Sequence, residues 1–493
     1  MQRPIQFWFR GRLQSVSEVS PTRTVLQWLR EDVHATGSKE GCGEGDCGAC
    51  TVTLGELDDT APGGVRLRAV NSCIQFLPTL DGKALFTVED LAGPAGSPQK
   101  LHPVQQAMVD CHGSQCGFCT PGFVMSLWAD YESRANSGQC PTRDEINDTL
   151  SGNLCRCTGY RPIVDAAQKA WDMAPTHIDR NPIREVLETL SHLPSLDYSH
   201  NGQRFQAPHA VSELGAAIAA QPDAQLLSGS TDIGLWVTKH LKQLGNIIYL
   251  GACTELKQID VHDDVLEIGA GVTLTDAFAA LVADEPAWGE QARRFASTPV
   301  RNAGTLGGNV ANGSPIGDSM PGLIALGTRI VLQHGARIRE MPLDEFYLAY
   351  QKTAREPGEF VRALKVPRAP AGRIFRSYKV SKRQDQDISA VSAAFALFMD
   401  DAGRIGDARV AFGGMAATPK RAAACEAALR GQAWSEDTVR NAMAALDGDY
   451  APLSDMRASS AYRSKVARNL LWRMWLETES MRGAVQADVR LPA

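Results

Sequence analysis

Residues 41–50 read Gly41-Cys42-Gly43-Glu44-Gly45-Asp46-Cys47-Gly48-Ala49-Cys50, and another cysteine follows at Cys73. Glycines let such a loop wrap closely around a small centre and turn its N–H groups inward. The N-terminus has no apolar run long enough for a secretion signal. We therefore expect reduced thiols, which act as metal ligands rather than as disulfide partners.

The spacing within this loop indicates which metal centre it holds. Cys42, Cys47, Cys50 and Cys73 follow the C-x4-C-x2-C…C pattern with which plant-type ferredoxins hold a [2Fe–2S] cluster. Zinc is the alternative, but zinc ribbons favour paired C-x2-C knuckles over an asymmetric glycine-rich loop. The four cysteines are therefore predicted to be cluster ligands.

A second set of cysteines comprises Cys116, Cys119, Cys155 and Cys157. Taken alone, C-x2-C with C-x-C could also hold zinc. Thr120-Pro121-Gly122 resembles the start of a helix, where unpaired N–H groups and the macrodipole stabilise thiolates. Its position behind a ferredoxin-type site favours a second [2Fe–2S] cluster, and two clusters in series indicate electron transfer.

The other cysteines and histidines are not predicted to bind a metal. Two four-thiolate sites are complete without them, and no two histidines stand at a metal-ligand spacing. The residues concerned are Cys111, Cys140, Cys253, Cys425, His102 and His112.

Composition excludes several classes of function. The 493 residues are 44% hydrophobic and 22% charged, with a net charge of −6, which is ordinary for a globular protein. No basic stripe suggests nucleic acid as a partner. No apolar run of about 18 residues suggests a membrane span. We expect a cytoplasmic protein.

The length requires several domains. Alternating short runs and one helix near Thr24–Arg30 predict a small α+β domain, and helical periodicity then predicts a bundle. Scattered prolines predict a linker with a short helix at 183–190. In the region after the linker, strands and helices alternate. The last region of the chain has one predicted strand at 390–398, followed by helices to about 482. The predicted ranges are 1–85, 86–166, 167–202 for the linker, 203–378 and 379–485.

Two glycine-rich segments in the fourth region suggest a nucleotide site. Residues 226–234 (LLSGSTDIG) follow a predicted strand and could present N–H groups to a pyrophosphate. Residues 304–309 (GTLGGN) precede Asp318, whose carboxylate suits a ribityl or ribose hydroxyl. Neither segment matches G-x-G-x-x-G or a P-loop, so two tight turns remain an equal alternative at this point.

The order of these motifs resembles a known family. The ferredoxin-type loop, then QCGFCTPG at 115–122 and NLCRCTGY at 153–160, then the two glycine-rich segments, is similar to the molybdenum hydroxylases. Within them it looks most like the small subunits of bacterial xanthine dehydrogenases, and the likeness covers nearly the whole chain. The resemblance implies a multidomain α+β fold. Its parts are a ferredoxin-like β-grasp domain, a helical-bundle [2Fe–2S] domain, an FAD-binding α/β domain of the vanillyl-alcohol-oxidase type and a C-terminal α+β flavoprotein domain.

The resemblance also assigns cofactor residues. It gives the two cysteine sets to two [2Fe–2S] clusters, with the second nearer the molybdenum centre. Tyr350 is similar to the residue over the flavin edge where NAD+ docks, whereas residues 384–388 differ in length from eukaryotic relatives and carry no NAD+ contact. The implied FAD contacts are Leu226, Leu227, Ser228, Gly229, Ser230, Thr231, Asp232, Ile233, Phe295, Thr305, Gly308, Asn309, Asp318 and Lys379.

The function implied is electron transfer in purine catabolism. Electrons from hypoxanthine or xanthine leave a molybdopterin centre on a separate large subunit, pass through both clusters to FAD and reach NAD+. No catalytic residue is expected in this chain, and the family suggests a heterotetramer of two heterodimers. Alternatives are the same subunit of an aldehyde, nicotinate or CO dehydrogenase, or a stand-alone flavin/iron–sulfur reductase.

Overall fold

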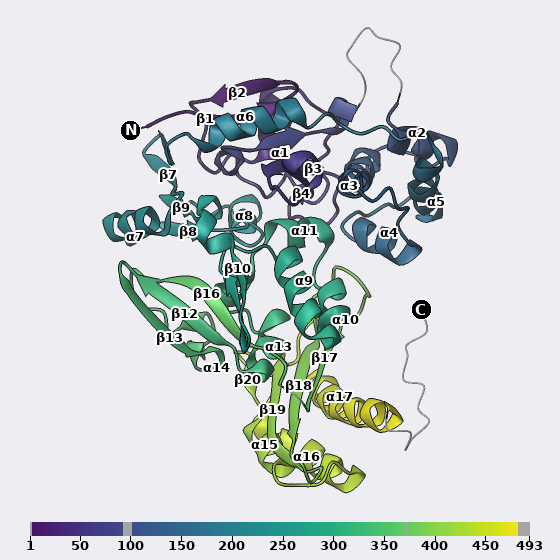
Figure 1. The fold of residues 1–493 in the computed structure, drawn as a ribbon, viewed down its shortest axis with the longest axis vertical. Helices are drawn as coiled ribbons and strands as arrows, with labels where there is room; N and C mark the ends of the chain where they lie inside the picture. The colour runs from purple at the N-terminus through teal and green to yellow at the C-terminus, as the bar shows by residue number, and fades with distance from the viewer. Residues whose placement is uncertain (1, 92–100, 371, 482–493) are drawn as a thin grey trace. The chain divides into compact units, whose positions relative to one another are not determined.

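The structure is a computed structural model that describes residues 2–91, 101–370 and 372–481 (Figure 1). It divides into two compact units, and we describe each by itself. The first unit comprises Met1–Thr254 and Ala296–Gly304, and the second comprises Glu255–Phe295 and Thr305–Ala493.

The first unit begins with a five-stranded mixed sheet in the order β2-β1-β5-β3-β4. β1 pairs in parallel with β5, and the other neighbours are antiparallel. The short helix α1 (Val25–Gln27) continues into a π-helical turn, which places Trp28 edge-on against Phe7 and Phe9. This is the predicted β-grasp arrangement. The strands are β1 (Ile5–Phe9), β2 (Arg12–Val16), β3 (Thr51–Leu57), β4 (Val65–Asn71) and β5 (Ala84–Phe86).

Four helices follow and form the predicted helical bundle. Their apolar faces meet in one core that includes Phe123, Leu127 and Ile163, each fully or almost fully buried. Helix α3 begins directly after Cys119 with proline in its first turn, as the sequence predicts. The helices are α2 (Pro103–Asp110), α3 (Thr120–Ser133), α4 (Arg143–Leu150) and α5 (Arg161–Lys169).

The predicted linker 167–202 is more ordered than the sequence suggests. Its helix, α6 (Asn181–Ser191), is longer than the expected 183–190, and β6 (Leu196–His200) is a strand. In β6 the buried residues Leu196 and Tyr198 alternate with polar ones, and Asn201-Gly202 turns the strand back onto β7 (Gln203–Ala207) with positive φ at both turn residues. An irregular linker was therefore the wrong prediction for this stretch.

A second sheet completes the first unit, in the order β6-β7-β9-β8. β7, β9 and β8 run in parallel, so the carboxyl ends of β8 and β9 meet at one edge. The predicted strands at 225–227 and 247–250 are confirmed. The remaining elements are α7 (Val211–Ala220), β8 (Gln225–Leu227), α8 (Ile233–Thr238), β9 (Ile247–Tyr249) and α11 (Thr298–Ala303).

The second unit opens with an antiparallel sheet in the order β10-β11-β16-β12-β13, and β14 and β15 form a separate small hairpin. The predicted strands at 265–268 and 330–332 are confirmed. The elements are β10 (Ile259–Val261), β11 (Val265–Gly269), α9 (Leu274–Asp284), α10 (Gly289–Arg294), α12 (Leu306–Asn312), α13 (Ser319–Leu326), β12 (Arg329–His334), β13 (Arg337–Pro342), α14 (Leu343–Phe346), β14 (Tyr347–Ala349), β15 (Lys352–Thr353) and β16 (Phe360–Pro367).

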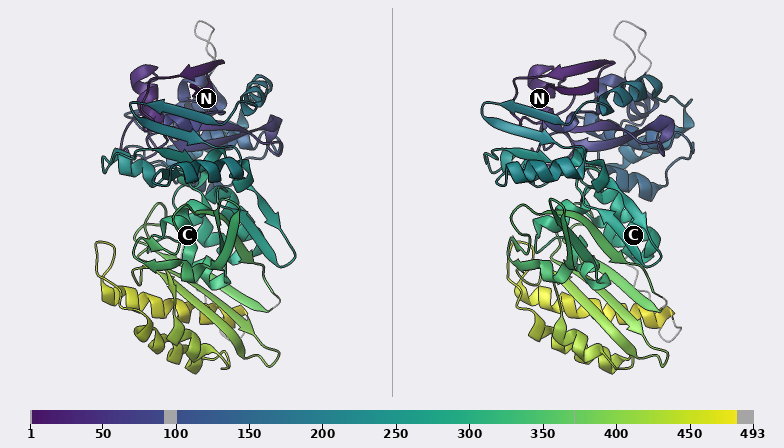
Figure 2. Two further views of the ribbon diagram at one scale, coloured as in Figure 1. Left: turned by 90° about the vertical axis from the view of Figure 1, so that its left-hand side faces the viewer. Right: turned by 60° about the vertical axis from the view of Figure 1, so that its left-hand side comes forward.

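The C-terminal part of this unit is a four-stranded antiparallel sheet with helices on it (Figure 2). The sequence predicted one strand here, at 390–398, and missed three. β19 carries Gly406-Asp407 and several alanines, so its alternation is weak, and pairing with β18 decides its structure. The elements are β17 (Arg373–Val380), β18 (Val391–Met399), β19 (Ile405–Gly413), β20 (Lys420–Arg421), α15 (Ala423–Leu429), α16 (Glu436–Asp449) and α17 (Ser460–Met481).

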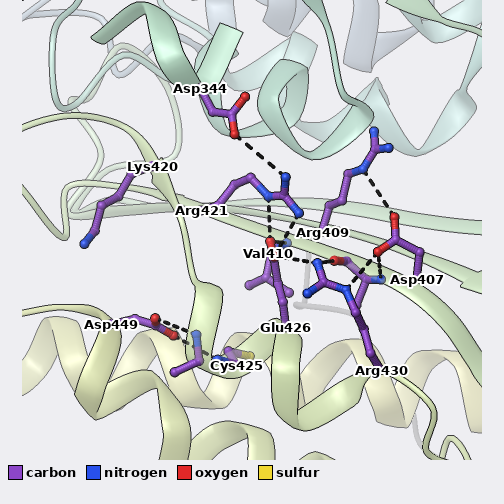
Figure 3. A network of polar contacts seen from close by, with 12 residues as sticks. Asp344, Asp407, Arg409, Val410, Lys420, Arg421, Cys425, Glu426, Arg430 and Asp449 are labelled. Carbon is purple, nitrogen blue, oxygen red and sulfur yellow. Dashed lines mark hydrogen bonds and ion pairs between the residues drawn. The ribbon is translucent and has the colours of Figure 1, made fainter. Parts of the chain in front are cut away.

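A buried carboxylate joins this sheet to its helices (Figure 3). Glu426 on α15 is 3% exposed and forms ion pairs with Arg421 and Arg430, at 2.8 and 2.9 Å. The Val410 N–H of β19 also donates to it, at 2.9 Å. The buried carboxylate thus accepts from two guanidinium groups and one backbone N–H, as a buried charge requires. Among the described residues, no helix is long and apolar enough to cross a membrane.

Acid is expected to weaken the second unit through Glu359. The Arg339 guanidinium binds both oxygens of this carboxylate at 2.7 Å, which lowers its pKa from 4.5 to about 2. A carboxyl with a lowered folded pKa contributes stability above the unfolded pKa and loses it as the pH falls. Between about pH 4.5 and 2, stability should fall more steeply in the wild type than in Glu359→Gln, as measured by hydrogen exchange in β12 and β16. Equal slopes would exclude this contribution.

Candidate cofactor sites

The first cysteine set converges in the first unit. The side chains of Cys47 and Cys73 hydrogen-bond to the Cys42 sulfur, which holds the pKa of Cys42 far below its ordinary value. Cys73 also bonds to Cys50 and lowers the pKa of that thiol. Because Cys73 donates to two sulfurs, its own pKa is raised. Contacts from Cys47 to Cys42, from Cys42 to Cys73 and from Cys73 to Cys50 therefore link the four thiols in one cluster.

Backbone donors surround the Cys42 sulfur. The N–H groups of Glu44, Asp46 and Cys47 point at it, at 3.4, 3.4 and 3.3 Å. Glycines make this wrapping possible: Gly43 and Gly45 have positive φ, and a Cβ on Gly41 would lie 2.7 Å from the Cys47 sulfur. N–H donors aimed at thiolate sulfur are the donors that an iron–sulfur cluster needs.

The second cysteine set also forms pairs. Cys119 contacts Cys155, and burial followed by that contact raises the pKa of Cys119 to about 12. Burial opposes ionisation of Cys155 as well, but the hydroxyl and N–H of Thr158, at 3.2 and 3.4 Å, outweigh it and lower the pKa of Cys155. Cys157 bonds to Cys116, which raises the pKa of Cys157. The four thiols thus meet as two pairs.

Pairs of thiols suit a two-iron centre. A [2Fe–2S] cluster takes four thiolates, two on each iron. Each donor set would therefore suit one [2Fe–2S] cluster: Cys42, Cys47, Cys50 and Cys73 would hold one, and Cys116, Cys119, Cys155 and Cys157 would hold the other.

The two cysteine sites are joined by backbone contacts that the sequence did not reveal. The Leu154 N–H, next to Cys155, donates to the carbonyl of Cys47 at 3.0 Å. The Asn153 amide donates to the Gly48 carbonyl at 3.1 Å and accepts from Ser126. No Cβ fits here, because one on Gly48 would lie 2.1 Å from the carbonyl oxygen of Gly152. The loop before Cys155 is therefore bonded to the loop that carries Cys47.

The second site is the more exposed of the two. Cys50 and Cys73 of the first site are 1% and 3% exposed, whereas Cys116 and Cys157 are surface residues. Large apolar side chains lie exposed in the same loops. They are Phe118, Leu154 and Tyr160, at 46%, 38% and 39%.

The glycine-rich segment 226–233 lies at the carboxyl end of β8, as predicted, and continues into α8. Gly229 packs against the chain at Ala303 and Gly304, where a Cβ would come within 2.1 Å of the Ala303 carbonyl oxygen. In parallel sheets, this end of the strands is the usual side for a nucleotide. The close packing of the loop against the start of the second glycine-rich segment favours a built site over an isolated tight turn.

The other predicted FAD residues lie in the second unit, and most are linked to one another. The Lys379 ammonium binds Asp318 at 2.7 Å, and both side chains are buried. Ser319, which follows Asp318 in the chain, donates to Asn309 on α12 at 2.5 Å. Thr305 is the N-cap of the same helix, and its hydroxyl accepts the N–H of Gly308 at 3.1 Å. Phe295 directly follows α10 and packs against Phe278, with ring centroids 5.1 Å apart.

Two residues of this group escaped the sequence analysis. Ser389 donates to the second oxygen of Asp318 at 2.5 Å. Buried Arg294 donates to the Lys379 carbonyl at 2.8 Å and to Ser381. Their partners lie 71 and 85 residues away, so no local signal marks them. Asp318 therefore binds both ends of the segment from Lys379 to Ser389.

The remaining predicted residues have simpler surroundings. Tyr350 is 60% exposed in the turn between β14 and β15. His102 caps α2 through the Val104 N–H and is bonded to the Thr176 carbonyl, and burial lowers its pKa to about 4. Cys253 and Cys425 are buried in the cores, Cys111 is partly buried, and Cys140 lies at the surface. His112 has positive φ beside Gly113.

Loss of the Asp318 carboxylate is expected to weaken flavin binding. Asp318→Ala removes the partner of two buried donors, Lys379 and Ser389, which should loosen the segment between them. Loss of a hydrogen bond to a charged group costs about 1.5–3 kcal/mol of stability. FAD content after gel filtration should fall while iron content stays constant. Asp284→Ala, which breaks a 2.8 Å ion pair with Arg368 elsewhere in this unit, is the matched control. Full flavin content in Asp318→Ala would remove Asp318 from the site.

Comparison with protein families gives four matches in chain order. Residues 10–75 match the 2Fe-2S iron-sulfur cluster binding domain, and residues 87–168 match a [2Fe-2S] binding domain. Residues 200–369 match the FAD binding domain in molybdopterin dehydrogenase, and residues 376–478 match the CO dehydrogenase flavoprotein C-terminal domain.

Longer proteins contain the whole of this arrangement. Xanthine dehydrogenase of Emericella nidulans is 31% identical over 98% of the chain, and xanthine dehydrogenase 1 of Arabidopsis thaliana is 30% identical over 86%. The chain covers only 39% and 36% of those two proteins.

Solved structures match a smaller part. A chain of CO dehydrogenase from Hydrogenophaga pseudoflava is similar at 28% identity and a TM-score of 0.52, covering 55% of this chain and 94% of that one. Quinoline 2-oxidoreductase from Pseudomonas putida 86 is similar at 26% identity and a TM-score of 0.51, covering 57% and 98%.

Proposed function

We propose that this chain, which belongs to the molybdenum hydroxylases as their iron–sulfur and FAD-binding small subunit, carries electrons from a purine-oxidising partner to NAD+. Two [2Fe–2S] clusters supply one-electron steps, and FAD joins them to a two-electron acceptor. The task of this polypeptide is to hold the three groups in order. No residue of it is assigned to the chemistry on the purine.

The continuous contact between the two cysteine sites carries this proposal. Leu154 is the neighbour of Cys155 in the second site, and its N–H donates to the carbonyl of Cys47 in the first site. This hydrogen bond links the two sites directly. Buried surroundings at Cys50 and Cys73 suit an internal carrier, and surface thiols at Cys116 and Cys157 suit a group that exchanges electrons with another chain.

The exposed apolar side chains indicate where the partner binds. Phe118, Leu154 and Tyr160 flank the second site, and exposed aromatic residues near a redox group are typical of protein interfaces. We infer that a large molybdopterin-binding subunit covers this surface. Its counterpart is the part of the xanthine dehydrogenases, more than three fifths of their length, that this chain does not match. A heterotetramer of two heterodimers in the cytoplasm is proposed from the family likeness.

NAD+ as acceptor rests on Tyr350 and on the named relatives. An exposed tyrosine can stack on a nicotinamide ring without rearrangement of the core, and the xanthine dehydrogenases are the relatives that span nearly all of the chain. A second candidate is the same role in a hydroxylase of another substrate. It is favoured by the solved CO dehydrogenase and quinoline 2-oxidoreductase chains.

The proposal is tested on the complex isolated from its native source through an affinity tag on this chain. We expect a large molybdenum-containing partner to co-purify, and hypoxanthine and xanthine to be oxidised with NAD+ faster than with oxygen. Activity with an aldehyde, nicotinate, quinoline or CO instead would favour the second candidate. A stable chain without any partner, reducing a free carrier, would support a stand-alone reductase and overturn the subunit proposal.

A further inference from the structure

Residues 226–233, which we call the FAD loop, are hydrogen-bonded directly to the residues that follow Cys73 of the first cysteine site. The Ser230 hydroxyl donates to the Ile74 carbonyl at 2.6 Å, and the Gln75 amide donates to the Gly229 carbonyl at 3.0 Å. Ile74 and Gln75 come directly after Cys73. Two crossed hydrogen bonds thus connect residues 229–230 with residues 74–75.

Both side chains are buried, so these bonds are protected from water. Ser230 is 3% exposed and Gln75 is 7% exposed. A hydrogen bond in such surroundings is stronger than one at the surface, and its loss leaves a buried carbonyl without a donor. The contact is therefore well defined rather than incidental.

The local backbone is shaped around this contact. Ser230 has a φ of 62°, a left-handed conformation that is uncommon for serine. Gly234 at the start of α8 allows close approach, because a Cβ there would lie 2.5 Å from the Ile74 carbonyl oxygen. Leu235 then packs onto the buried group formed by Leu26, Cys50, Cys73 and Ile74. Strain of this kind persists where the surrounding structure requires it.

We propose that Ser230 and Gln75 are positioning residues that fix the FAD loop against the Cys73 backbone, and so set the rate of electron transfer between the first cluster and the flavin. This deepens the proposed function and rests on it. Ser230 and Gln75 would hold the two loops together. The bound cluster would supply one electron to the bound flavin, and the proton that the flavin takes up would come from solvent. No covalent bond in the protein forms or breaks.

The variants separate positioning from stability. Ser230→Ala removes the hydroxyl and keeps the strained backbone, whereas Ser230→Gly removes the same hydroxyl and suits a positive φ. Gln75→Glu keeps the shape and removes the donor. Thr79→Ala is the matched control, since it deletes another buried hydroxyl bond, to the Phe76 carbonyl at 2.7 Å, outside the FAD loop.

The measurement uses the full protein saturated with FAD. A flash of light with 5-deazariboflavin injects electrons, and their redistribution between flavin and cluster is followed by absorbance. Electron transfer slows as the separation of donor and acceptor grows, so we expect a several-fold slowing in the Ser230 and Gln75 variants. Ser230→Ala and Ser230→Gly should slow equally despite different unfolding temperatures, and Thr79→Ala should match the wild type.

Three results would overturn the proposal. If Ser230→Ala and Gln75→Glu transferred electrons at the wild-type rate, the two hydrogen bonds would not control electron transfer between the cluster and the flavin. Rates that follow unfolding temperature, with Ser230→Gly near the wild type, would make the effect one of stability alone. Equal slowing in Thr79→Ala would make it unspecific. A wild-type protein that binds no iron or no FAD would instead contradict the proposed function itself, so the two failures are distinct.

Discussion

Replacing Cys50 by serine is expected to abolish one of two [2Fe–2S] EPR signals in the dithionite-reduced protein. Cys50 is 1% exposed and bonded to Cys73, so no other donor can take its place without rearrangement of the core. A serine hydroxyl is a far weaker ligand for iron than a thiolate. Iron content should fall by about half, because each of the two sites takes one four-thiolate cluster.

Other cysteine variants serve as controls for this result. Cys157→Ser should remove or alter only the other signal, because Cys157 contacts Cys116 in the second site. Cys140→Ser and Cys425→Ser, one exposed and one buried, should leave both signals unchanged. Stoichiometric zinc in the wild type, or loss of both signals in Cys157→Ser, would contradict two separate clusters.

Replacing Glu132 by leucine is expected to cause the largest loss of stability. This side chain on α3 is fully buried and binds Arg180, itself 8% exposed, at 2.9 Å. It also accepts the Ile178 N–H at 3.2 Å, so it holds the segment after the short helix η5 (Ala170–Asp172) against the helical bundle. Burial raises the pKa of Glu132 even with Arg180 beside it. Removal of one partner of a buried ion pair costs about 3–5 kcal/mol, since the other charge stays buried.

Hydrogen exchange in α3 and in residues 176–184 measures this loss, because several domains make one global unfolding free energy ill-defined. The double variant Glu132→Leu/Arg180→Met should recover most of the protection, since no buried charge then remains. Arg184→Ala, which removes surface ion pairs of the neighbouring helix α6, should change protection little. Unchanged exchange in Glu132→Leu would show that the cluster does not hold this segment.

Local patterns predicted much of this protein. Cysteine spacing predicted two cluster sites, because the ligands within each short motif are placed by their own loop, although Cys73 and the Cys155/Cys157 pair come from more distant segments. Proline after Cys119 predicted the start of α3, and short apolar runs predicted β8, β9 and β11. The hairpin of β6 and β7 could also have been found, since Asn201-Gly202 is a strong turn signal.

Strands that depend on distant partners were not predictable in the same way. β19 has little alternation of its own and becomes a strand because β18 pairs along its whole length. Ser389 and Arg294 are equally invisible, since nothing near them in sequence marks their bonds to Asp318 and to the Lys379 carbonyl. Side chains of common types acquire a role only when folding brings their partner to them.

The sequence by itself predicted two iron–sulfur clusters, because cysteine identity and the spacing within each short cysteine motif are local chemical properties. Only the tertiary structure decided how the cysteine sites and the FAD loop of the first unit connect. The Leu154 N–H meets the Cys47 carbonyl there, and Ser230 meets the carbonyl of Ile74. Backbone N–H and C=O groups are the same at every residue, so their pairing leaves no mark in the sequence until the chain folds.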